Sequence, residues 1–329
     1  MKRRSFIITS FGGVAGILTL PAFTLKSDNE EWNCVRKSTE LETTIILHGL
    51  KEPFTIMQIA DSHISYENES DKEYDIYSKR MREANPTVID YKTKERVSSL
   101  DGFSSILQHA KDLKTDFIVL NGDIISYPSA TAIQTIYELM EKTNIPFVYT
   151  AGNHDWHYEG MPGSAEQLRK EWTEKRLKIL YKGKNPLYES NIINGINIVT
   201  IDNSTYQVNE EQVNFYKEQQ RKKEPIALFL HIPIYMPTIG SGSFGDPNWG
   251  AAIDYNYQIE RRERWPESGN APSTYRFINE VMKTKKLTGI FAGHLHQATT
   301  ISYKEKYQFI AGAGIYGQYR LIKFLPFSK

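Results

Sequence analysis

Five short polar blocks along the chain contain residue types that bind metal ions. They are Asp61-Ser62-His63, Gly122-Asp123, Gly152-Asn153-His154-Asp155, a lone His231, and Gly293-His294-Leu295-His296. Carboxylate, amide and imidazole groups suit Mn, Fe, Zn and similar divalent ions. Cys34 is the only cysteine, which excludes a thiolate cluster and an intramolecular disulfide. Any metal must therefore sit on His, Asp, Glu or Asn.

Each block follows a short apolar run that is bounded by turn residues, which is typical of a buried strand. The predicted strands before the blocks span residues 54–59, 117–120, 147–150, 226–230 and 287–292. Open α/β sheets bind ligands at the carboxyl ends of their strands. On an extended backbone, residues two apart share a face, so we expect Asp61 with His63, and His294 with His296, to point together.

A single block is weak evidence. Taken alone, His231 is more often a hydrogen-bonded structural histidine than a ligand. The conjunction carries the prediction, because five of the eight histidines in the chain fall at predicted strand ends beside Asp or Asn.

The elements around the blocks alternate between strand and helix, which predicts an α/β fold with largely buried strands. A further strand is expected at 196–201, and a carboxyl-terminal set at 298–303, 307–311 and 319–324 should complete a second sheet. Two long segments, 65–100 and 235–273, break the alternation and follow predicted ligands. We expect them to form a rim or lid. The predicted helices span 103–113, 130–142, 165–180, 210–221 and 274–283.

Length and charge limit the classes of function. The chain has 329 residues with 40 basic and 39 acidic side chains, and its first 25 residues carry three of the basic ones, which leaves 37 minus 39, or −2, for the rest. A near-neutral body argues against strong nucleic-acid binding, which requires clustered cations. We expect one large domain at 52–329, preceded by an extension at 26–51 that holds a first strand. No stable protein partner is inferred.

Residues 1–25 have the layout of an export signal, with basic residues followed by an uncharged apolar run. Arg3-Arg4-Ser5-Phe6-Ile7 resembles the twin-arginine signal, which implies export in the folded state. The alternatives are an ordinary secretory signal or an uncleaved membrane anchor, because the run approaches the roughly 20 residues that span a bilayer. A periplasmic or extracellular location is therefore expected.

As an ordered set, the five blocks resemble the calcineurin-like metallophosphoesterase family, and the resemblance covers roughly residues 52–325. It implies two mixed β-sheets packed as a sandwich and flanked by helices, with a dinuclear metal site at the strand carboxyl ends. Asp61, His63 and His296 would bind one divalent ion. Asn153, His231 and His294 would bind the other, and Asp123 would bridge both. Two ions about 3.5–4 Å apart can share a hydroxide that attacks phosphorus.

His154 is left out of the implied ligand set and is expected to stabilise the transition state or to protonate the departing alkoxide. A general acid contributes about 10²–10⁴-fold to such a reaction. Asp155 is expected to accept a hydrogen bond from His154 and keep the imidazole oriented, as carboxylates beside metal sites commonly do. The alternative for Asp155 is a turn cap.

Purple acid phosphatases are relatives with a different first block, Asp-x-Gly, and a tyrosinate three residues after the Gly-Asp aspartate. Here the corresponding residues are His63 and Ser126. Tyr127 lies one residue further along, and on an extended backbone it would point away from the site. A tyrosinate-ligated centre is therefore not expected, unless a bulge realigns Tyr127.

The resulting hypothesis is an exported, metal-dependent hydrolase of phosphate monoesters or diesters. Its substrate would be a small phosphate ester or an exposed phosphate group. The alternative is a non-catalytic, metal-stabilised protein of the same fold that binds a glycan or a protein. Such proteins usually lose ligands, and none of the expected ligands is missing here, so the enzyme is favoured.

Overall fold

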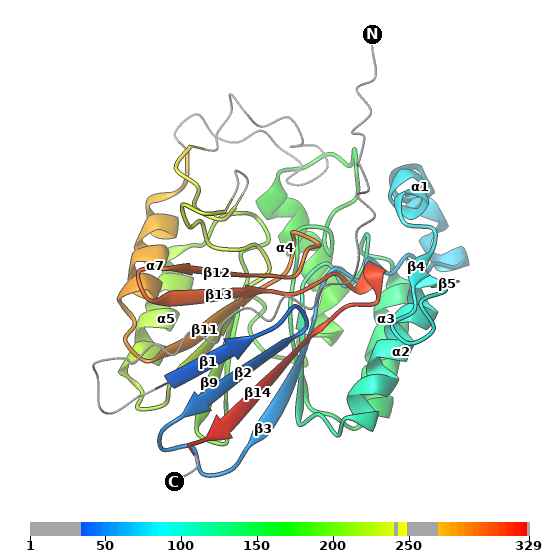
Figure 1. Cartoon of the computed structure of the whole chain (residues 1–329). Helices are drawn as coiled ribbons and strands as arrows, with labels where there is room; N and C mark the ends of the chain where they lie inside the picture. Colours follow the sequence, from blue (N-terminus) through cyan, green and yellow to red (C-terminus); the bar gives the residue numbers. More distant parts are fainter. Residues whose placement is uncertain (1–33, 240–242, 249–268, 328–329) are drawn as a thin grey trace.

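Two six-stranded sheets pack face to face and are flanked by helices (Figure 1). The structure is a computed structural model that describes residues 34–239, 243–248 and 269–327. The predicted export signal and residues 249–268 of the second long segment lie outside this range. Among the described residues, no helix is both long and apolar enough to cross a membrane.

The first sheet joins strands from both ends of the described chain. β3, β6 and β7 run parallel, β14 is antiparallel to β3 and parallel to β2, and β1 pairs antiparallel with β2. The prediction that residues 319–324 complete the second sheet was wrong, because β14 lies between β2 and β3. In order, the strands are β1 (Cys34–Ser38), β2 (Glu42–Leu47), β14 (Arg320–Pro326), β3 (Phe54–Ile59), β6 (Phe117–Asn121) and β7 (Phe147–Thr150).

The second sheet has a parallel centre and antiparallel edges. Its centre contains the strands predicted at 196–201, 226–230 and 287–292, and β12 and β13 join it as expected. In order, the strands are β12 (Thr299–Tyr303), β13 (Lys306–Ile310), β11 (Leu287–Ala292), β10 (Ile226–Phe229), β9 (Ile196–Ile201) and β8 (Tyr188–Ile193).

Apolar residues that alternate along the strands fill the space between the sheets. Phe54 and Phe324 stack with ring centroids 4.7 Å apart, and Phe229 and Phe291 do so at 4.8 Å on the opposing sheet. The outer faces are buried under helices. α2 (Ser99–Asp112), α3 (Ala130–Thr143) and α4 (Ala165–Lys175) cover the first sheet, and α5 (Glu210–Arg221) and α7 (Pro272–Lys283) cover the second.

Two buried amide side chains tie the sheets together near the strand carboxyl ends. Gln58 of β3 donates to the carbonyl of Ala292 in β11 at 2.9 Å. Asn121 of β6 donates to the carbonyl of Leu230, just after β10, at 3.1 Å. Buried polar groups need such partners, so these bonds fix the register of one sheet against the other. The loops that follow the four strands are thereby brought face to face.

The segment 65–100 is folded against the domain. It contains the 3-10 helix η2 (Glu69–Tyr74), α1 (Asp75–Ala84) and a two-stranded ribbon of β4 (Val88–Ile89) and β5 (Arg96–Val97). Asp71 is buried, accepts from the backbone N–H of Ala130 at the start of α3, and pairs with Arg176 at 2.9 Å. These bonds anchor the segment to the domain.

Candidate metal centre

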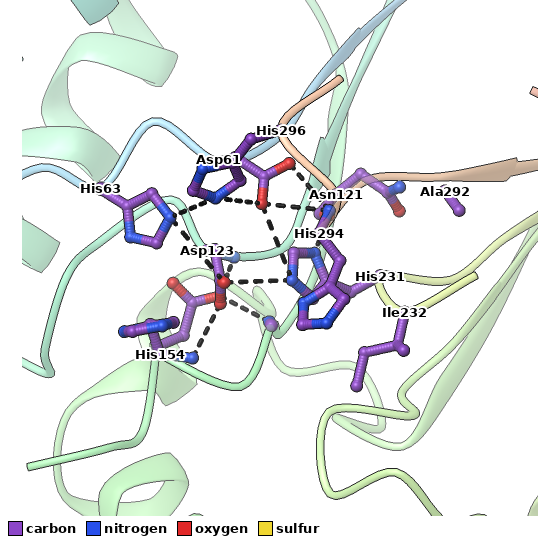
Figure 2. A network of polar contacts seen from close by, with 12 residues as sticks. Asp61, His63, Asn121, Asp123, His154, His231, Ile232, Ala292, His294 and His296 are labelled. Carbon is purple, nitrogen blue, oxygen red and sulfur yellow. Dashed lines mark hydrogen bonds and ion pairs between the residues drawn. The ribbon is translucent and has the colours of Figure 1, made fainter. Parts of the chain in front are cut away.

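Six of the seven predicted ligands, all except Asn153, are seen to converge at the edge where both sheets end (Figure 2). The ligand atoms of Asp61, His63 and His296 lie within 4.8 Å of one another, and so do those of Asp123, His231 and His294. His63 and Asp123 also form a third such group with His154. The residues that could hold a metal ion are therefore brought together as two clusters joined through Asp123.

The polar atoms of the two clusters face one another closely. His63 Nε2 lies 3.0 Å from His296 Nε2, and His296 Nε2 lies 3.5 Å from Asp61 Oδ1. His231 Nε2 lies 3.1 Å from Asp123 Oδ2 and 3.9 Å from Asp61 Oδ1. Because these groups approach within a few ångströms, a small shift of side chains suffices to admit an ion between them.

Five of the predicted ligands adopt a left-handed backbone conformation, with φ between 43° and 71°. They are Asp61, His63, Asp123, His294 and His296. The expectation that paired ligands meet because they alternate on extended strands was therefore wrong in its mechanism, since β3 has ended at Ile59 and β11 at Ala292. Such conformations cost about 1–3 kcal/mol each and cluster at functional sites. The side chains converge because the backbone turns.

Backbone bonds between neighbouring loops hold these turns. The N–H groups of Asp61 and His63 donate to the carbonyls of Gly122 and Asp123, both at 3.0 Å. On the second sheet, the N–H of Gly293 donates to the carbonyl of His231 at 2.9 Å. The ladder of each sheet thus continues past the last strand residue into the ligand-bearing loops.

The two halves also contact each other directly. The backbone N–H of His294 donates to Asp61 Oδ2 at 2.9 Å, so a carboxylate of the first sheet orients a loop of the second. Gly122 has φ +84°, and a Cβ there would lie 2.4 Å from Nδ1 of His231. A glycine is therefore required where the imidazole of His231 packs over the first sheet.

His231 is fully buried, and its two ring nitrogens have different environments. Nδ1 lies 2.9 Å from the carbonyl oxygen of Asn121, to which it donates in the tautomer that carries its proton there. In that neutral tautomer Nε2 has a lone pair facing the cluster, whereas in the metal-free protein the Asp123 carboxylate, 3.1 Å away, favours a proton on Nε2. A backbone carbonyl that fixes the tautomer in this way is common for histidine ligands of metals.

The site also contains a buried polar atom that lacks a hydrogen-bond partner. Oδ1 of Asn153 is buried without one. Leaving such an acceptor unpaired costs about 1–3 kcal/mol. A cation supplies the missing partner, and the imidazoles and carboxylates of the two clusters are groups that bind divalent ions, so the residues present fit a bound metal ion.

Burial and neighbouring charges shift the pKa values of the histidines in opposite directions. Burial, together with the nearby His154, lowers the pKa of His63 to about 3. Burial, together with His231, lowers the pKa of His294 to about 3. Burial also opposes protonation of His231, but the Asp123 carboxylate outweighs it and raises that pKa. His63 and His294 are therefore neutral at pH 7, which is the form that binds metals.

Asp155 does not orient His154, and this expectation was wrong. Asp155 is fully buried, and its Oδ2 accepts from the backbone N–H groups of Gly152 at 2.7 Å and Asp123 at 3.0 Å. Its Oδ1 accepts from the N–H of Ile125 at 3.0 Å. The carboxylate thus bonds its own turn to the loop that carries Asp123, a role that resembles the turn cap considered as the alternative. Burial and the Asp123 carboxylate raise the pKa of Asp155.

His154 lies at the partly exposed side of the cluster. Its backbone N–H donates to Asp123 Oδ1 at 2.7 Å, and its ring packs edge-on to His63 with centroids 4.9 Å apart. A Cβ on Gly152 would lie 2.2 Å from Asp123 Oδ1, so the turn carrying His154 passes directly over the Asp123 carboxylate. The imidazole is therefore held beside the predicted ligands and remains accessible to solvent.

Tyr127 comes after the end of β6 at Asn121, and its side chain packs in the hydrophobic core. It is fully buried in the core between the first sheet and its helices, and its ring lies 5.8 Å from that of Tyr158. Burial raises its pKa, which disfavours a tyrosinate. Ser126, at the position of the tyrosine ligand of purple acid phosphatases, donates to the carbonyl of His63 at 2.8 Å.

The sequence-based prediction missed Tyr206, whose hydroxyl lies 3.0 Å from Nε2 of His294. It belongs to a polar loop that follows β9, a central strand of the second sheet that bears no predicted ligand. The polar run Asp202-Asn203-Ser204 directly after a buried strand was an available signal. It follows the same pattern as the five blocks.

Comparisons with known proteins agree with this geometry. The family model for calcineurin-like phosphoesterases matches residues 54–298. The chain is 23% identical over 238 residues to a protein of Psychrobacter sp. (strain PRwf-1) named as a probable cyclic nucleotide phosphodiesterase, an alignment covering 69% of this chain and 61% of that protein. A protein of Fibrobacter succinogenes with the same description is 23% identical over 257 residues, which is 78% of each chain.

Among solved structures, the chain is similar to a dimetal phosphatase from Danio rerio. The TM-score is 0.50 at 12% sequence identity, and the match covers 82% of this chain and 91% of the other. At this identity the likeness concerns the fold, which is the predicted sandwich of two mixed sheets flanked by helices.

Proposed function

Because the chain belongs to the calcineurin-like phosphoesterase family and is a metal-dependent phosphoesterase, we propose that it is an exported hydrolase that acts with two divalent ions. Asp61, His63 and His296 would hold one ion, here called the first ion. Asn153, His231 and His294 would hold the second ion, and Asp123 would serve both.

Asp123 is the observation that carries this proposal. It is buried and shares a group of potential ligand atoms with His231 and His294, and another with His63 and His154. A carboxylate has two oxygens, so one residue in this place can serve both clusters. When bound, the ions lower the pKa of coordinated water and neutralise the charge that builds on the phosphoryl oxygens.

The remaining groups of the site act on protons and on position. His154 donates a proton to the oxygen of the departing alcohol, since its imidazole is partly exposed beside the clusters and is not one of the proposed ligands. Asp155 fixes the turn that carries Asn153 and His154 by closing it onto the Asp123 loop. In this proposal a general acid lies beside the two ions.

The substrate we propose is a phosphodiester, and both relatives described above are named as probable cyclic nucleotide phosphodiesterases. The test measures hydrolysis of bis(p-nitrophenyl) phosphate, p-nitrophenyl phosphate and cyclic AMP by protein loaded with Mn²⁺. We expect turnover of the two diesters to exceed that of the monoester. A preference for the monoester contradicts the diesterase proposal, and no turnover by protein that binds two ions contradicts the hydrolase itself.

Export is supported by the order of basic and apolar residues at the amino terminus, with Arg3 and Arg4 at the twin-arginine position. The test is cell fractionation of the full chain and of a variant in which both arginines are lysine. We expect the variant to accumulate inside the cell. Unchanged distribution points to another route, and cytoplasmic wild-type protein refutes export.

A further inference from the structure

Tyr206 is buried beside the proposed second ion. Its hydroxyl lies 3.0 Å from Nε2 of His294, and the two rings meet edge-on with centroids 5.7 Å apart at 81°. An imidazole nitrogen carries either a proton or a lone pair. The nitrogen that bonds to Tyr206 is therefore occupied, and Nδ1 of His294 is left for the second ion.

The backbone of Tyr206 is strained, with φ +63°. Bulky residues rarely adopt this conformation, and those that do cluster at functional sites. The surrounding structure holds it from both sides. The N–H of Tyr206 donates to the carbonyl of Asn203 at 2.8 Å, and the next side chain, Gln207, accepts from the N–H of Ala271 at 2.8 Å and from the hydroxyl of Thr274 at 2.7 Å. The start of α7 thus anchors the strained residue.

The same loop also hydrogen-bonds to the backbone beside a second proposed ligand. Asn203 is fully buried, and its amide donates to the carbonyl of Ile232 at 2.7 Å and accepts from the N–H of Ile232 at 3.0 Å. Ile232 directly follows His231. The loop after β9 therefore contacts the side chain of one proposed ligand and the backbone next to another, and both ligands belong to the second ion.

We propose that Tyr206 is a positioning residue that fixes the tautomer and orientation of His294, so that Nδ1 faces the second ion. This inference rests on the proposed two-ion function. Nε2–H of His294 donates to the hydroxyl oxygen of Tyr206, and the anchored loop keeps that oxygen in place. Partners of this kind typically change metal affinity by about 10–100-fold. The effect is selective, because the contacts described lie on the side of the second ion.

The experiment measures Mn²⁺ binding to metal-free full-length protein by calorimetric titration, for the wild type and for Tyr206→Phe. The variant keeps the ring and removes only the hydroxyl. We expect one of two dissociation constants to rise about 10–100-fold and the other to stay within about 3-fold of the wild type.

Tyr216→Phe is the matched control. Tyr216 is also fully buried, and its hydroxyl bonds to Thr284 at 3.0 Å, away from the cluster. This control should lower the melting temperature without changing either dissociation constant. If Tyr206→Phe does not fold, Gln207→Ala replaces it, because this variant removes the anchors and should weaken the same ion alone.

The outcomes distinguish a failure of the role proposed for Tyr206 from a failure of the two-ion proposal. Wild-type protein that binds no metal, or one ion, refutes the two-ion proposal. Wild-type protein that binds two ions, with Tyr206→Phe matching it at both, refutes the role of Tyr206. Equal weakening of both ions in Tyr206→Phe, or weakening in Tyr216→Phe as well, indicates a general loss of structure and also overturns the inference.

Discussion

Replacing Asp155 with Asn tests how the site is held together. The variant keeps the size of the side chain and one oxygen, which can still accept from Gly152 and Asp123. An amide group then faces the N–H of Ile125, which loses its acceptor. Losing a hydrogen bond to a charged acceptor and leaving a buried N–H unpaired costs about 3 kcal/mol together.

This cost has a measurable size. For a chain of 329 residues, an unfolding entropy of about 2.1 cal/mol/K per residue gives about 0.7 kcal/mol/K, so 3 kcal/mol lowers the melting temperature by about 4 °C. Because the Asp123 loop loses part of its support, Mn²⁺ affinity should also fall, by about 10–100-fold. The assays are thermal unfolding of the metal-free protein and Mn²⁺ titration, both at pH 8, where Asp155 is ionised.

Asp71→Asn is the control for Asp155→Asn. Asp71 is also buried, accepts from Ala130 and pairs with Arg176, but it lies in η2, outside the clustered groups. It should lower the melting temperature and leave Mn²⁺ affinity unchanged. The reasoning is refuted if Asp155→Asn keeps wild-type stability and metal affinity and loses only turnover, because Asp155 would then act on His154.

Three other predictions follow from the geometry. His154→Ala should keep its metal content and lose about 10²–10⁴-fold in kcat on diesters with poor leaving groups. Metal analysis and steady-state kinetics test the two parts of this prediction. Loss of metal from the variant would place His154 among the ligands. Gly152→Ala puts a Cβ 2.2 Å from Asp123 Oδ1 and should abolish tight Mn²⁺ binding. Gly289→Ala is the control, because its Cβ meets only aromatic side chains and should lower stability without changing Mn²⁺ affinity. Equal Mn²⁺ affinity in the two variants would contradict this prediction. The pKa of His63 in the folded protein is about 3, which is below its value of about 6.5 in the unfolded chain. Metal-free protein should therefore lose up to about 1.4 kcal/mol of stability per pH unit from this group as the pH falls from 6.5 toward 3. A melting temperature that does not change with pH over this range would exclude the shift.

The strands that bear ligands could be predicted from the sequence because each is a short apolar run that ends abruptly in a polar block. β3, β6, β7, β10 and β11 all lie within one residue of their predicted bounds. β8 was missed, since it is an edge strand whose residues are only partly buried and include Glu, Ser and Asn. Periodicity detects burial, and an edge strand offers little of it.

The site was predicted by residue type and only partly by geometry. The paired ligands of the first and last blocks do lie together, but left-handed turns bring them there, and no alternation pattern reveals a positive φ at Asp61 or His294. The role of Asp155 was misassigned because adjacency in sequence favoured His154 as its partner. Its actual partners include Asp123, which is 32 residues away. Contacts of this kind depend on the packing of loops in three dimensions.

The place of β14 in the first sheet bears on the order of synthesis and transport. β14 pairs with β3 on one side and β2 on the other, so these strands keep unpaired edges until residues 320–326 have left the ribosome. Such edges recruit other chains, which makes an incomplete chain prone to aggregation. Export through a pathway for folded proteins would have to wait until translation of this segment is finished.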